Sequence, residues 1–340
     1  MSIELSYTVH ELKFKHPFSV AGNTRNFTPM IIVRLICDNL EGYGEITMPP
    51  YLGETKDSAI NFLNHASEIS LSLNMSLEEF HELIDNISEG NNAAKAGLDI
   101  AFHDLKAKFN STNITSLYQL PAIKKHSSFT IGLDTPDIMV DKTKEALTLD
   151  FKVLKVKLGG SQDEACIRQI AKIWKGPISV DANQGWKDKE WSLDFCFELK
   201  ELGVQFVEQP FEKSNLNTAE WLTSRSPLPI IADESCKRFK DLEVVKNCFH
   251  GINVKLMKST GLYEAFKMLQ FAKNNRMKTV TGCMAESSCA VAAMSHFGVL
   301  ADWVDLDGPF LITNDPFESV KLIDGSIQVP RDIGIGVNLR

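Results

Sequence analysis

Eight strand-like runs separated by helical patterns extend along the chain: Ser128–Gly132, Phe151–Leu158, Ile178–Asp181, Gln205–Glu208, Ile230–Asp233, Ile252–Lys255, Thr279–Gly282 and Trp303–Asp305. From the second run onward, their ends recur every 22 to 27 residues. Strands that alternate with helices at this spacing are typical of a (β/α)₈-type barrel. A doubly wound sheet is the alternative, but it usually has fewer repeats and a glycine-rich first turn. The helix after the second run is expected to begin with a capping box formed by Ser161 and Glu164.

The residues before the barrel follow a different order, with strands first and helices after them. We expect strands over residues 3–15 and 29–37, a short third strand, and helices over about 55–72, 76–87 and 92–109. Two loops are expected, Pro17–Thr28 with Gly22 and Arg25, and Met48–Glu54 with Pro49, Pro50 and Gly53. Strands followed by helices predict a separate α+β unit. We therefore expect an α+β capping domain over residues 1–118, a barrel over 119–312, and a tail over 313–340 that returns to complete the capping domain.

Composition narrows the class of protein. The formal net charge of −8 argues against nucleic-acid binding. No apolar stretch is long enough to span a membrane, and the first residues do not resemble a signal peptide. The seven cysteines are scattered and none forms C-x-x-C, which favours a reducing cytoplasm over a disulfide framework or a zinc site. A homo-oligomer is compatible with the sequence, which does not specify subunit contacts.

Acidic residues end three consecutive strands of the predicted barrel. They are Asp181, Glu208 and Asp233, and active sites of such barrels lie at the carboxyl ends of the strands. Each acid alone has an ordinary alternative as a helix cap or a salt-bridge partner. Neighbouring strands are about 4.8 Å apart, so the three carboxylates converge and repel one another unless a cation lies between them. Ligation by carboxylate oxygens alone favours Mg²⁺, with Mn²⁺ as the second choice.

Lysines occupy the inner face of two other strands. Lys155 and Lys157 alternate on the strand Phe151–Leu158, and Lys255 ends the sixth run. An edge strand with lysines in water is the alternative for the first pair. In a closed eight-stranded barrel strands two and six lie opposite each other, so Lys157 and Lys255 would face each other across the mouth. Burial and the like charge of Lys155 both favour a neutral lysine that acts as a base. Proton removal on one face of a carbon acid and return on the other gives racemisation or epimerisation.

Five motifs together resemble the enolase superfamily, and in particular its muconate-lactonizing-enzyme subgroup: K-V-K at 155–157, D-A-N-Q-G-W at 181–186, V-E-Q-P at 207–210, A-D-E-S at 232–235 and N-V-K-L at 253–256. The resemblance implies a modified (β/α)₇β barrel with an N-terminal α+β cap. It implies that Asp181, Glu208 and Asp233 bind Mg²⁺, which stabilises an enediolate. It further implies that Lys157 and Lys255 are the acid/base pair and that Lys155 assists and contacts the substrate carboxylate.

The D-L-D motif at 305–307 resembles the dipeptide epimerases of that subgroup. Both acids face the same side of the last strand, where they would suit the ammonium of a dipeptide whose carboxylate lies on the metal about 6–7 Å away. Arg25 is similar in placement to the arginine of the Ala-Glu epimerases, which implies L-Ala-D-Glu/L-Ala-L-Glu as substrate. Thr130, Cys283 and Ala285 are expected to line the pocket. The alternatives for Asp305 and Asp307 are lysine partners or a helix cap, and for Arg25 a solvated loop.

Other reactions of the subgroup use the same lysines and metal. They include o-succinylbenzoate synthesis, N-acylamino acid racemisation and cycloisomerisation, but none of these substrates carries a cation for Asp305 and Asp307. A sugar-acid dehydratase would typically use a histidine on a late strand, where this chain has Lys255. An inactive binding protein is the alternative outside enzymes. The expected function is therefore a cytoplasmic, Mg²⁺-dependent isomerase that epimerises the C-terminal residue of a dipeptide.

Overall fold

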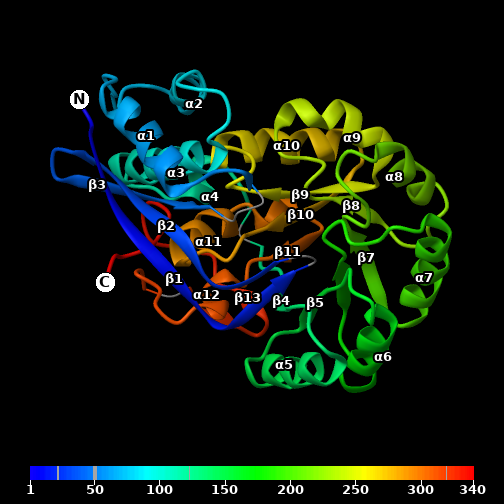
Figure 1. The fold of residues 1–340 in the computed structure, drawn as a ribbon. Coiled ribbons are helices and arrows are strands. Elements are labelled where there is room, and N and C mark those ends of the chain that lie inside the picture. Colours follow the sequence, from blue (N-terminus) through cyan, green and yellow to red (C-terminus); the bar gives the residue numbers. More distant parts are fainter. Residues whose placement is uncertain (21–22, 49–51, 122, 319) are drawn as a thin grey trace.

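A parallel barrel lies beside an antiparallel sheet in the computed structural model, which describes residues 1–20, 23–48, 52–121, 123–318 and 320–340 (Figure 1). The barrel strands are β4 (Ser128–Ile131), β5 (Val153–Lys157), β6 (Ile178–Asp181), β7 (Val204–Glu208), β8 (Ile230–Ala232), β9 (Gly251–Lys255), β10 (Lys278–Gly282) and β11 (Trp303–Asp305). They pair in sequence order, and a bridge between Ser127 and Val304 joins the two ends. The predicted barrel fold is confirmed.

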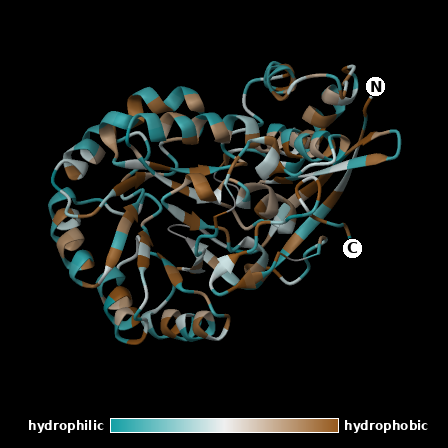
Figure 2. Cartoon of the chain, turned by 180° about the vertical axis from the view of Figure 1, so that it is seen from behind, coloured by the Kyte–Doolittle hydropathy of each residue, from teal (hydrophilic) through white to brown (hydrophobic). Residues whose placement is uncertain are grey.

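Helices surround the barrel on its outer side (Figure 1). They are α5 (Pro136–Thr148), α6 (Asp163–Ile173), α7 (Lys189–Glu201), α8 (Leu216–Thr223), α9 (Leu242–Cys248), α10 (Leu262–Asn274) and α11 (Ser288–Ser295). Figure 2 shows hydrophilic residues along their outward faces and hydrophobic residues on the strands that they cover. Among the described residues, no helix combines the length and apolar character needed to cross a bilayer.

The side chains of each strand alternate between two layers. On β5, Leu154 and Val156 point outward into the main core, where they are fully buried. The inward layer at the bottom of the barrel is a small separate cluster of Phe206, Ile231 and Val280. Lys155 and Lys157 therefore point into the barrel interior rather than into water, as their small exposed fractions of 2% and 7% show.

Helix α6 begins differently from the predicted capping box. Its N-cap is Gln162, and no side chain caps it, so the expectation for Ser161 and Glu164 was wrong. The carboxylate of Asp163, the first residue of the helix, instead accepts hydrogen bonds from the backbone N–H groups of Gly159 and Gly160 at 2.8 Å each. These bonds close the turn between β5 and α6.

The N-terminal sheet consists of β1 (Glu4–Val20), β2 (Asn23–Cys37) and β3 (Leu40–Thr47), paired antiparallel in that order. The expected loop over 17–28 was wrong, because β1 extends to Val20 and β2 begins at Asn23, so the described residues of this segment are in strands. After a register shift between Lys13 and Phe18, the pairs Phe18–Arg25 and Ser19–Thr24 extend the ribbon. Arg25 is thus held on a strand, whereas Gly22 lies outside the described residues.

The helices that the structure describes in this part of the chain are α1 (Lys56–Ser67), α2 (Leu77–Asp85), α3 (Asn92–Phe109) and α4 (Ile114–Leu117). The helix α3 packs on β3 at very short range, since a Cβ at Gly44 would lie 1.9 Å from the carbonyl oxygen of Gly97. A Cβ at Gly42 would likewise lie 2.2 Å from the carbonyl oxygen of Ala101, so this close packing requires glycine at both positions. In the expected loop Met48–Glu54, Pro49 and Pro50 lie outside the described residues.

The tail returns to the N-terminal sheet and helices, and the C-terminus lies beside β1 (Figure 1). The backbone N–H of Ile335 donates to Asp104 of α3 at 2.8 Å, and Gly334 forms a bridge with Asn113. The tail also contains a two-stranded antiparallel hairpin, β12 (Leu322–Ile323) and β13 (Ser326–Ile327). A further short helix, α12 (Gly308–Leu311), follows the last barrel strand.

Buried carboxylates join the N-terminal part to the barrel helices. Glu45 of β3 accepts from the backbone N–H groups of Ser287 at 2.9 Å and Ala290 at 3.1 Å, at the beginning of α11. Asp99 of α3 accepts from the N–H of Leu262 at 2.5 Å, at the beginning of α10. The adjacent Gly261 has a φ of +111°, and a Cβ there would lie 2.2 Å from Asp99, so only glycine fits.

Candidate active site

Three carboxylates meet at the carboxyl ends of adjacent barrel strands. Asp181 ends β6, Glu208 ends β7, and Asp233 follows the last residue of β8. One oxygen from each lies within 4.8 Å of the others, and the three side chains are buried. The pairing of Asp181 with Glu208 in the register of β6 and β7 fixes the first two side by side. The structure therefore brings together the three acids that the sequence singled out.

Lys155 lies below this cluster and contacts several acids at once. Its Nζ is 2.9 Å from Glu208 Oε2, 3.2 Å from Asp181 Oδ2 and 2.8 Å from Asp305 Oδ2. These carboxylates outweigh the effect of burial and raise the pKa of Lys155 well above its usual value. Lys155 is thus a fixed cation, suited to holding carboxylates.

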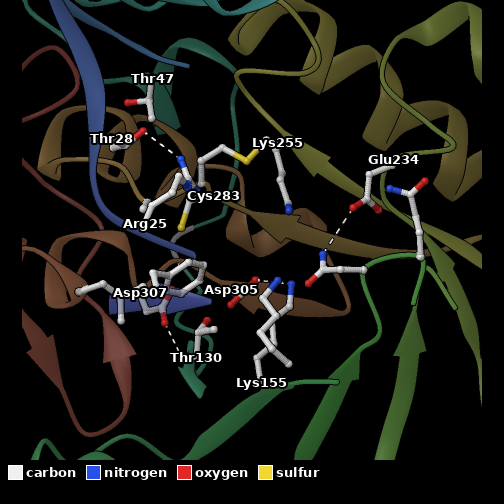
Figure 3. Close-up of a pocket in the computed structure, with 17 residues that line it drawn as sticks. Arg25, Thr28, Thr47, Thr130, Lys155, Glu234, Lys255, Cys283, Asp305 and Asp307 are labelled. Atoms are coloured by element: carbon white, nitrogen blue, oxygen red, sulfur yellow. Dashed lines mark hydrogen bonds and ion pairs between the residues drawn. The ribbon is translucent and has the colours of Figure 1, made fainter. Parts of the chain in front are cut away.

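Two further lysines reach the cluster from opposite walls. Lys157 Nζ of β5 donates to Asp181 Oδ2 at 2.6 Å, and Lys255 Nζ of β9 donates to Asp233 Oδ2 at 2.8 Å. The strands β5 and β9 are four apart in the order of the eight-stranded sheet, so closure of the barrel puts them opposite each other. Figure 3 shows Lys255 and Lys155 extending toward one another across the cavity.

The surroundings of the three acids shift their pKa values in different directions. Burial alone would raise the pKa of Asp181, but Lys157 and Lys155 hold it well below its usual value. Lys255 and Lys258 similarly lower the pKa of Asp233 against the effect of burial. Burial and the negative charge of Asp181 raise the pKa of Glu208 to about 7. A cation placed among the three would favour the charged form of all of them.

The donor set fits a hard divalent ion. The three acids offer only carboxylate oxygens, which Mg²⁺ and Mn²⁺ prefer. Two buried acceptors beside the cluster, Asn183 Oδ1 and Glu234 Oε2, have no hydrogen-bond partner among the described residues. Both residues line the adjoining cavity. Buried oxygens without a donor favour a cation or water in this space.

One cavity above the cluster collects the predicted substrate-binding residues. It is lined by Arg25, Thr130, Cys283, Ala285, Asp305 and Asp307 together with Lys155, Lys157 and Lys255. These side chains come from β2, from several barrel strands and from the turn after β10 (Figure 3). Burial raises the pKa of the Cys283 thiol well above its usual value, which disfavours a thiolate nucleophile.

Asp305 and Asp307 have different partners although both line the cavity. Asp305 contacts Lys155 and accepts from Ser128 Oγ at 2.6 Å. Asp307 accepts from the backbone N–H of Thr130 at 2.6 Å. Burial and the charge of Asp305 raise the pKa of Asp307 to about 7. Of the pair, Asp307 would therefore gain more from a cation in the cavity.

Arg25 enters the cavity from the N-terminal sheet. Its Nη1 is 3.4 Å from Thr28 Oγ1, and its guanidinium is 5.8 Å from the centre of the Phe14 ring. The cavity thus has a cationic group on the capping side and two acids on the barrel side. This distribution suits a ligand that carries both charges.

Several residues of the site carried no clear sequence signal. Phe18, Thr28, Thr47 and Leu311 line the cavity from segments whose fold brings them there. Asn253 donates to Glu208 Oε1 at 2.9 Å, and Lys258 contacts Asp233. The inward alternation of β9 could have indicated Asn253, which lies two residues before Lys255. Lys258 lies in the turn beyond the strand, where alternation says nothing.

Two family models match the sequence. The model described as Mandelate racemase / muconate lactonizing enzyme, N-terminal domain, matches residues 3–120, and the one described as Enolase C-terminal domain-like matches residues 139–340. A relative from Bacteroides thetaiotaomicron named L-Ala-D/L-Glu epimerase is 44% identical over 98% of this chain and 88% of its own length. A relative from Flavobacterium johnsoniae named L-Ala-D/L-amino acid epimerase is 33% identical over 97% of this chain and 98% of its own.

Solved structures are also similar over their whole length. A dipeptide epimerase from Cytophaga hutchinsonii, complexed with Mg and the dipeptide D-Ala-L-Val, has a TM-score of 0.93 at 26% identity, covering 100% of this chain and 96% of that one. A dipeptide epimerase from Enterococcus faecalis, complexed with Mg and L-Leu-L-Tyr, has a TM-score of 0.93 at 28% identity and 99% coverage of both chains. The chain belongs to the mandelate racemase/muconate lactonizing enzyme family of the enolase superfamily.

Proposed function

We propose that this protein is a Mg²⁺-dependent epimerase that inverts the α-carbon of the C-terminal residue of a dipeptide, with L-Ala-D-Glu and L-Ala-L-Glu as its substrates. The observation that carries the proposal is the cluster of three buried acids with Lys157 and Lys255 on opposite walls above it. The names of the relatives and the Mg and dipeptide complexes of the similar structures support it.

Asp181, Glu208 and Asp233 would hold the ion, with Mn²⁺ as an alternative to Mg²⁺. When bound, the ion lowers the energy of the negative charge that develops on the substrate carboxylate as the α-proton leaves. Lys155 adds a fixed positive charge at the same end of the cavity, since the carboxylates around it keep it protonated. A substrate carboxylate at this place leaves its α-carbon within the space between the two walls.

Lys157 and Lys255 would move the proton. The neutral form of one lysine removes the α-proton from its side of the carbon, and the ammonium of the other returns a proton from the opposite side. Because the amines belong to opposite strands, this two-base 1,1-proton transfer inverts the configuration. Each turnover breaks one C–H bond and one ammonium N–H bond and forms one of each on the opposite sides, and reversal of the roles converts the other epimer.

The remaining charges of the cavity would select the substrate. Asp307, with Asp305 behind it, would bind the ammonium of the first residue. Arg25 on the capping side would pair with the side-chain carboxylate of the second residue. Thr130, Cys283 and Ala285 would form the walls between these ends. Substrates of N-acylamino acid racemases lack this ammonium and would offer no cation to Asp307, whereas Asp305 already contacts Lys155.

Incubation of the Mg²⁺-loaded protein with L-Ala-L-Glu in D₂O tests the function. We expect deuterium at the α-carbon of Glu by mass spectrometry and the appearance of L-Ala-D-Glu by chiral chromatography. N-acetyl-L-Ala-L-Glu is the matched control, and it should react poorly because it lacks the ammonium. A protein that exchanges the acetylated compound as well as the free dipeptide, or that exchanges neither, would contradict the proposal.

Exchange of Arg25 tests the assignment of the glutamate side chain. Loss of a charged hydrogen-bonding partner should raise KM of Arg25→Gln for L-Ala-L-Glu by about 10- to 100-fold. The KM for L-Ala-L-Gln should change much less. Arg34→Gln is the matched control, because Arg34 is on the same strand but pairs with Glu41 away from the cavity. An equal loss with both dipeptides would mean that Arg25 does not contact the carboxylate.

We also propose domain boundaries, a cellular location and a subunit assembly for the whole protein. Residues 1–118 with the tail 313–340 would form the capping domain and residues 119–312 the barrel, which the contacts of Ile335 and Gly334 with the N-terminal part support. A cytoplasmic location agrees with free, buried cysteines. A homo-oligomer would be detected by light scattering of the purified protein.

A further inference from the structure

A lysine outside the predicted catalytic set lies directly behind one of the proposed metal ligands. Lys258 is in the turn between β9 and α10 and is 2% exposed. Its Nζ contacts the carboxylate oxygen Oδ1 of Asp233. It also donates to the backbone carbonyls of Asp233 at 2.7 Å, Asn253 at 2.9 Å and Cys236 at 3.0 Å. The position of this ammonium is therefore fixed by main-chain carbonyls of β9 and of the loop that follows β8.

The two oxygens of Asp233 have separate partners. Lys258 contacts Oδ1 from behind, whereas Lys255 donates to Oδ2 at 2.8 Å on the side of the cavity. A carboxylate held at one oxygen by a fixed donor cannot rotate freely about its last bond. Lys255 Nζ, the partner of Oδ2, is also 3.9 Å from Glu208 Oε1, so Oδ2 lies on the side of the cluster, whereas Oδ1 is held by Lys258.

We propose that Lys258 is a positioning residue for the metal site: it holds Asp233 so that this residue binds the ion through Oδ2 alone. The inference rests on the proposed function, in which Asp233 is a metal ligand. Groups that orient a metal ligand from behind typically contribute about 10- to 100-fold to metal affinity. In Lys258→Met, Oδ1 loses its donor, and Asp233 becomes free to rotate or to bind the ion with both oxygens.

The matched control is a buried lysine far from the cluster. Lys95 of α3 is 1% exposed and its Nζ contacts Asp85 at 2.8 Å. Both Lys258→Met and Lys95→Met remove a buried ammonium, and both are expected to lower the unfolding temperature. Only the first removes a group that touches a proposed metal ligand, so metal affinity separates positioning from general stabilisation.

Calorimetric titration with Mg²⁺ and Mn²⁺ in the absence of substrate is the test. We expect Kd to rise by about 10- to 100-fold in Lys258→Met and to stay within about twofold of the wild type in Lys95→Met. An unchanged Kd in folded Lys258→Met would overturn the inference while leaving the proposed function intact. Absence of metal binding by the wild type would overturn both.

A crystal structure of the Mn²⁺-loaded wild type keeps the inference testable if Lys258→Met does not fold. It should show Asp233 bound to the metal through one oxygen, with Lys258 Nζ still within hydrogen-bonding distance of the other. A chelating Asp233, or a Lys258 that has left it, would contradict the assignment. The same crystals of a folded Lys258→Met should show Asp233 rotated or chelating.

Discussion

Two regions of the molecule bury carboxylates but differ in the groups that donate hydrogen bonds to them. The first is the barrel mouth, with Asp181, Glu208 and Asp233. The second is the junction between the N-terminal part and the barrel, with Glu45 and Asp99. At the mouth, Asp181 and Asp233 are paired with the amines of Lys157 and Lys255. At the junction, Glu45 accepts from two backbone N–H groups and two hydroxyls, those of Ser287 at 2.5 Å and Thr47 at 2.7 Å. At the mouth, one oxygen of Asp181 also accepts from the backbone N–H of Asn183 at 2.9 Å, but the oxygens that face the lysines have partners that can exchange. At the junction, backbone N–H groups hold both oxygens of Glu45, and these groups cannot exchange.

This difference distinguishes the candidate active site at the mouth from a structural joint, that is, a region that holds two parts of the fold together. Flexible lysines can turn from a carboxylate to a substrate when an ion takes their place. Main-chain N–H groups at the beginning of a helix stay where the helix is, and the helix dipole adds to their attraction for an anion. Substitutions at the mouth should therefore lower activity more than stability. Substitutions at the junction should lower stability more than activity.

Removal of the metal should have the largest effect on activity. We expect dialysis against EDTA to abolish epimerisation and added Mg²⁺ to restore it. The metal-free protein should keep its circular dichroism spectrum, because each acid of the cluster has a lysine partner without the ion. Saturation at 100 times Kd should raise the free energy of unfolding by only about 2.7 kcal/mol. Unfolding on metal removal would show that the mouth is a structural joint as well.

Replacement of Lys157 or Lys255 should have the second-largest effect on activity. We expect Lys157→Met and Lys255→Met to lower kcat/KM by about 10²- to 10⁴-fold, the usual contribution of a general acid or base. Each variant keeps one base on one wall, so each should still exchange the α-proton of one epimer in D₂O without inverting it. The two variants should prefer different epimers.

A preference of both lysine variants for the same epimer would contradict the placement of the two lysines on opposite faces of the substrate. If both variants exchange the same epimer, or if one still inverts at the wild-type rate, the two amines do not act from opposite faces. Unfolding temperatures close to that of the wild type would show that the losses belong to catalysis.

The barrel and its acids could be predicted because regular strands obey simple rules. Alternation placed Lys155 and Lys157 inward, and the recurring strand ends placed Asp181, Glu208 and Asp233 on one rim. Features that depend on tertiary contacts were beyond these rules. The segment 17–28 contains proline and glycine and reads as a loop, yet it forms a strand ribbon that carries Arg25. Likewise, the sequence allowed a lysine partner for Asp305 but could not identify it as Lys155, which lies 150 positions away.

The histidines show that residue type alone does not reveal whether a side chain is structural or catalytic. His103 and His296 have structural partners, and the ring nitrogens of His103 hydrogen-bond with the carbonyl of Asp99 and the hydroxyl of Tyr118. His296 pairs with Thr115 at 2.7 Å, and burial lowers its pKa to about 4. A histidine side chain is suited to both structural and catalytic roles. The positions of His103 on α3 and His296 at the end of α11, away from the carboxyl ends of the barrel strands, indicate the structural role.

Acid should weaken the junction through Glu264 of α10. Burial would raise the pKa of this carboxyl, but His81 and Arg238 lower it from 4.5 to about 2 in the folded protein. A depressed folded pKa gives stability that is complete above about pH 4.5 and is lost as the pH falls toward about 2. The shift corresponds to about 3 kcal/mol.

Urea unfolding of the wild type and Glu264→Gln over a range of pH measures this contribution. The difference in free energy of unfolding between them should be largest near neutrality and shrink below about pH 4.5. A constant difference down to the acid limit would mean that Glu264 does not contribute through its charge. Epimerase activity at neutral pH should change little, since Glu264 does not line the cavity.

The smallest expected effect is at Glu45, and it tests the comparison most directly. In Glu45→Gln one acceptor oxygen becomes an NH₂ group facing donors of Ser287 or Ala290, which should cost about 1–3 kcal/mol of stability. Thermal unfolding measures this cost, with exposed Glu190→Gln as the control. Because the carboxylate fixes the beginning of α11 just after Cys283 and Ala285, a small rise in KM should accompany it. A large loss of kcat without loss of stability would instead assign Glu45 to the reaction, and the distinction between mouth and junction would fail.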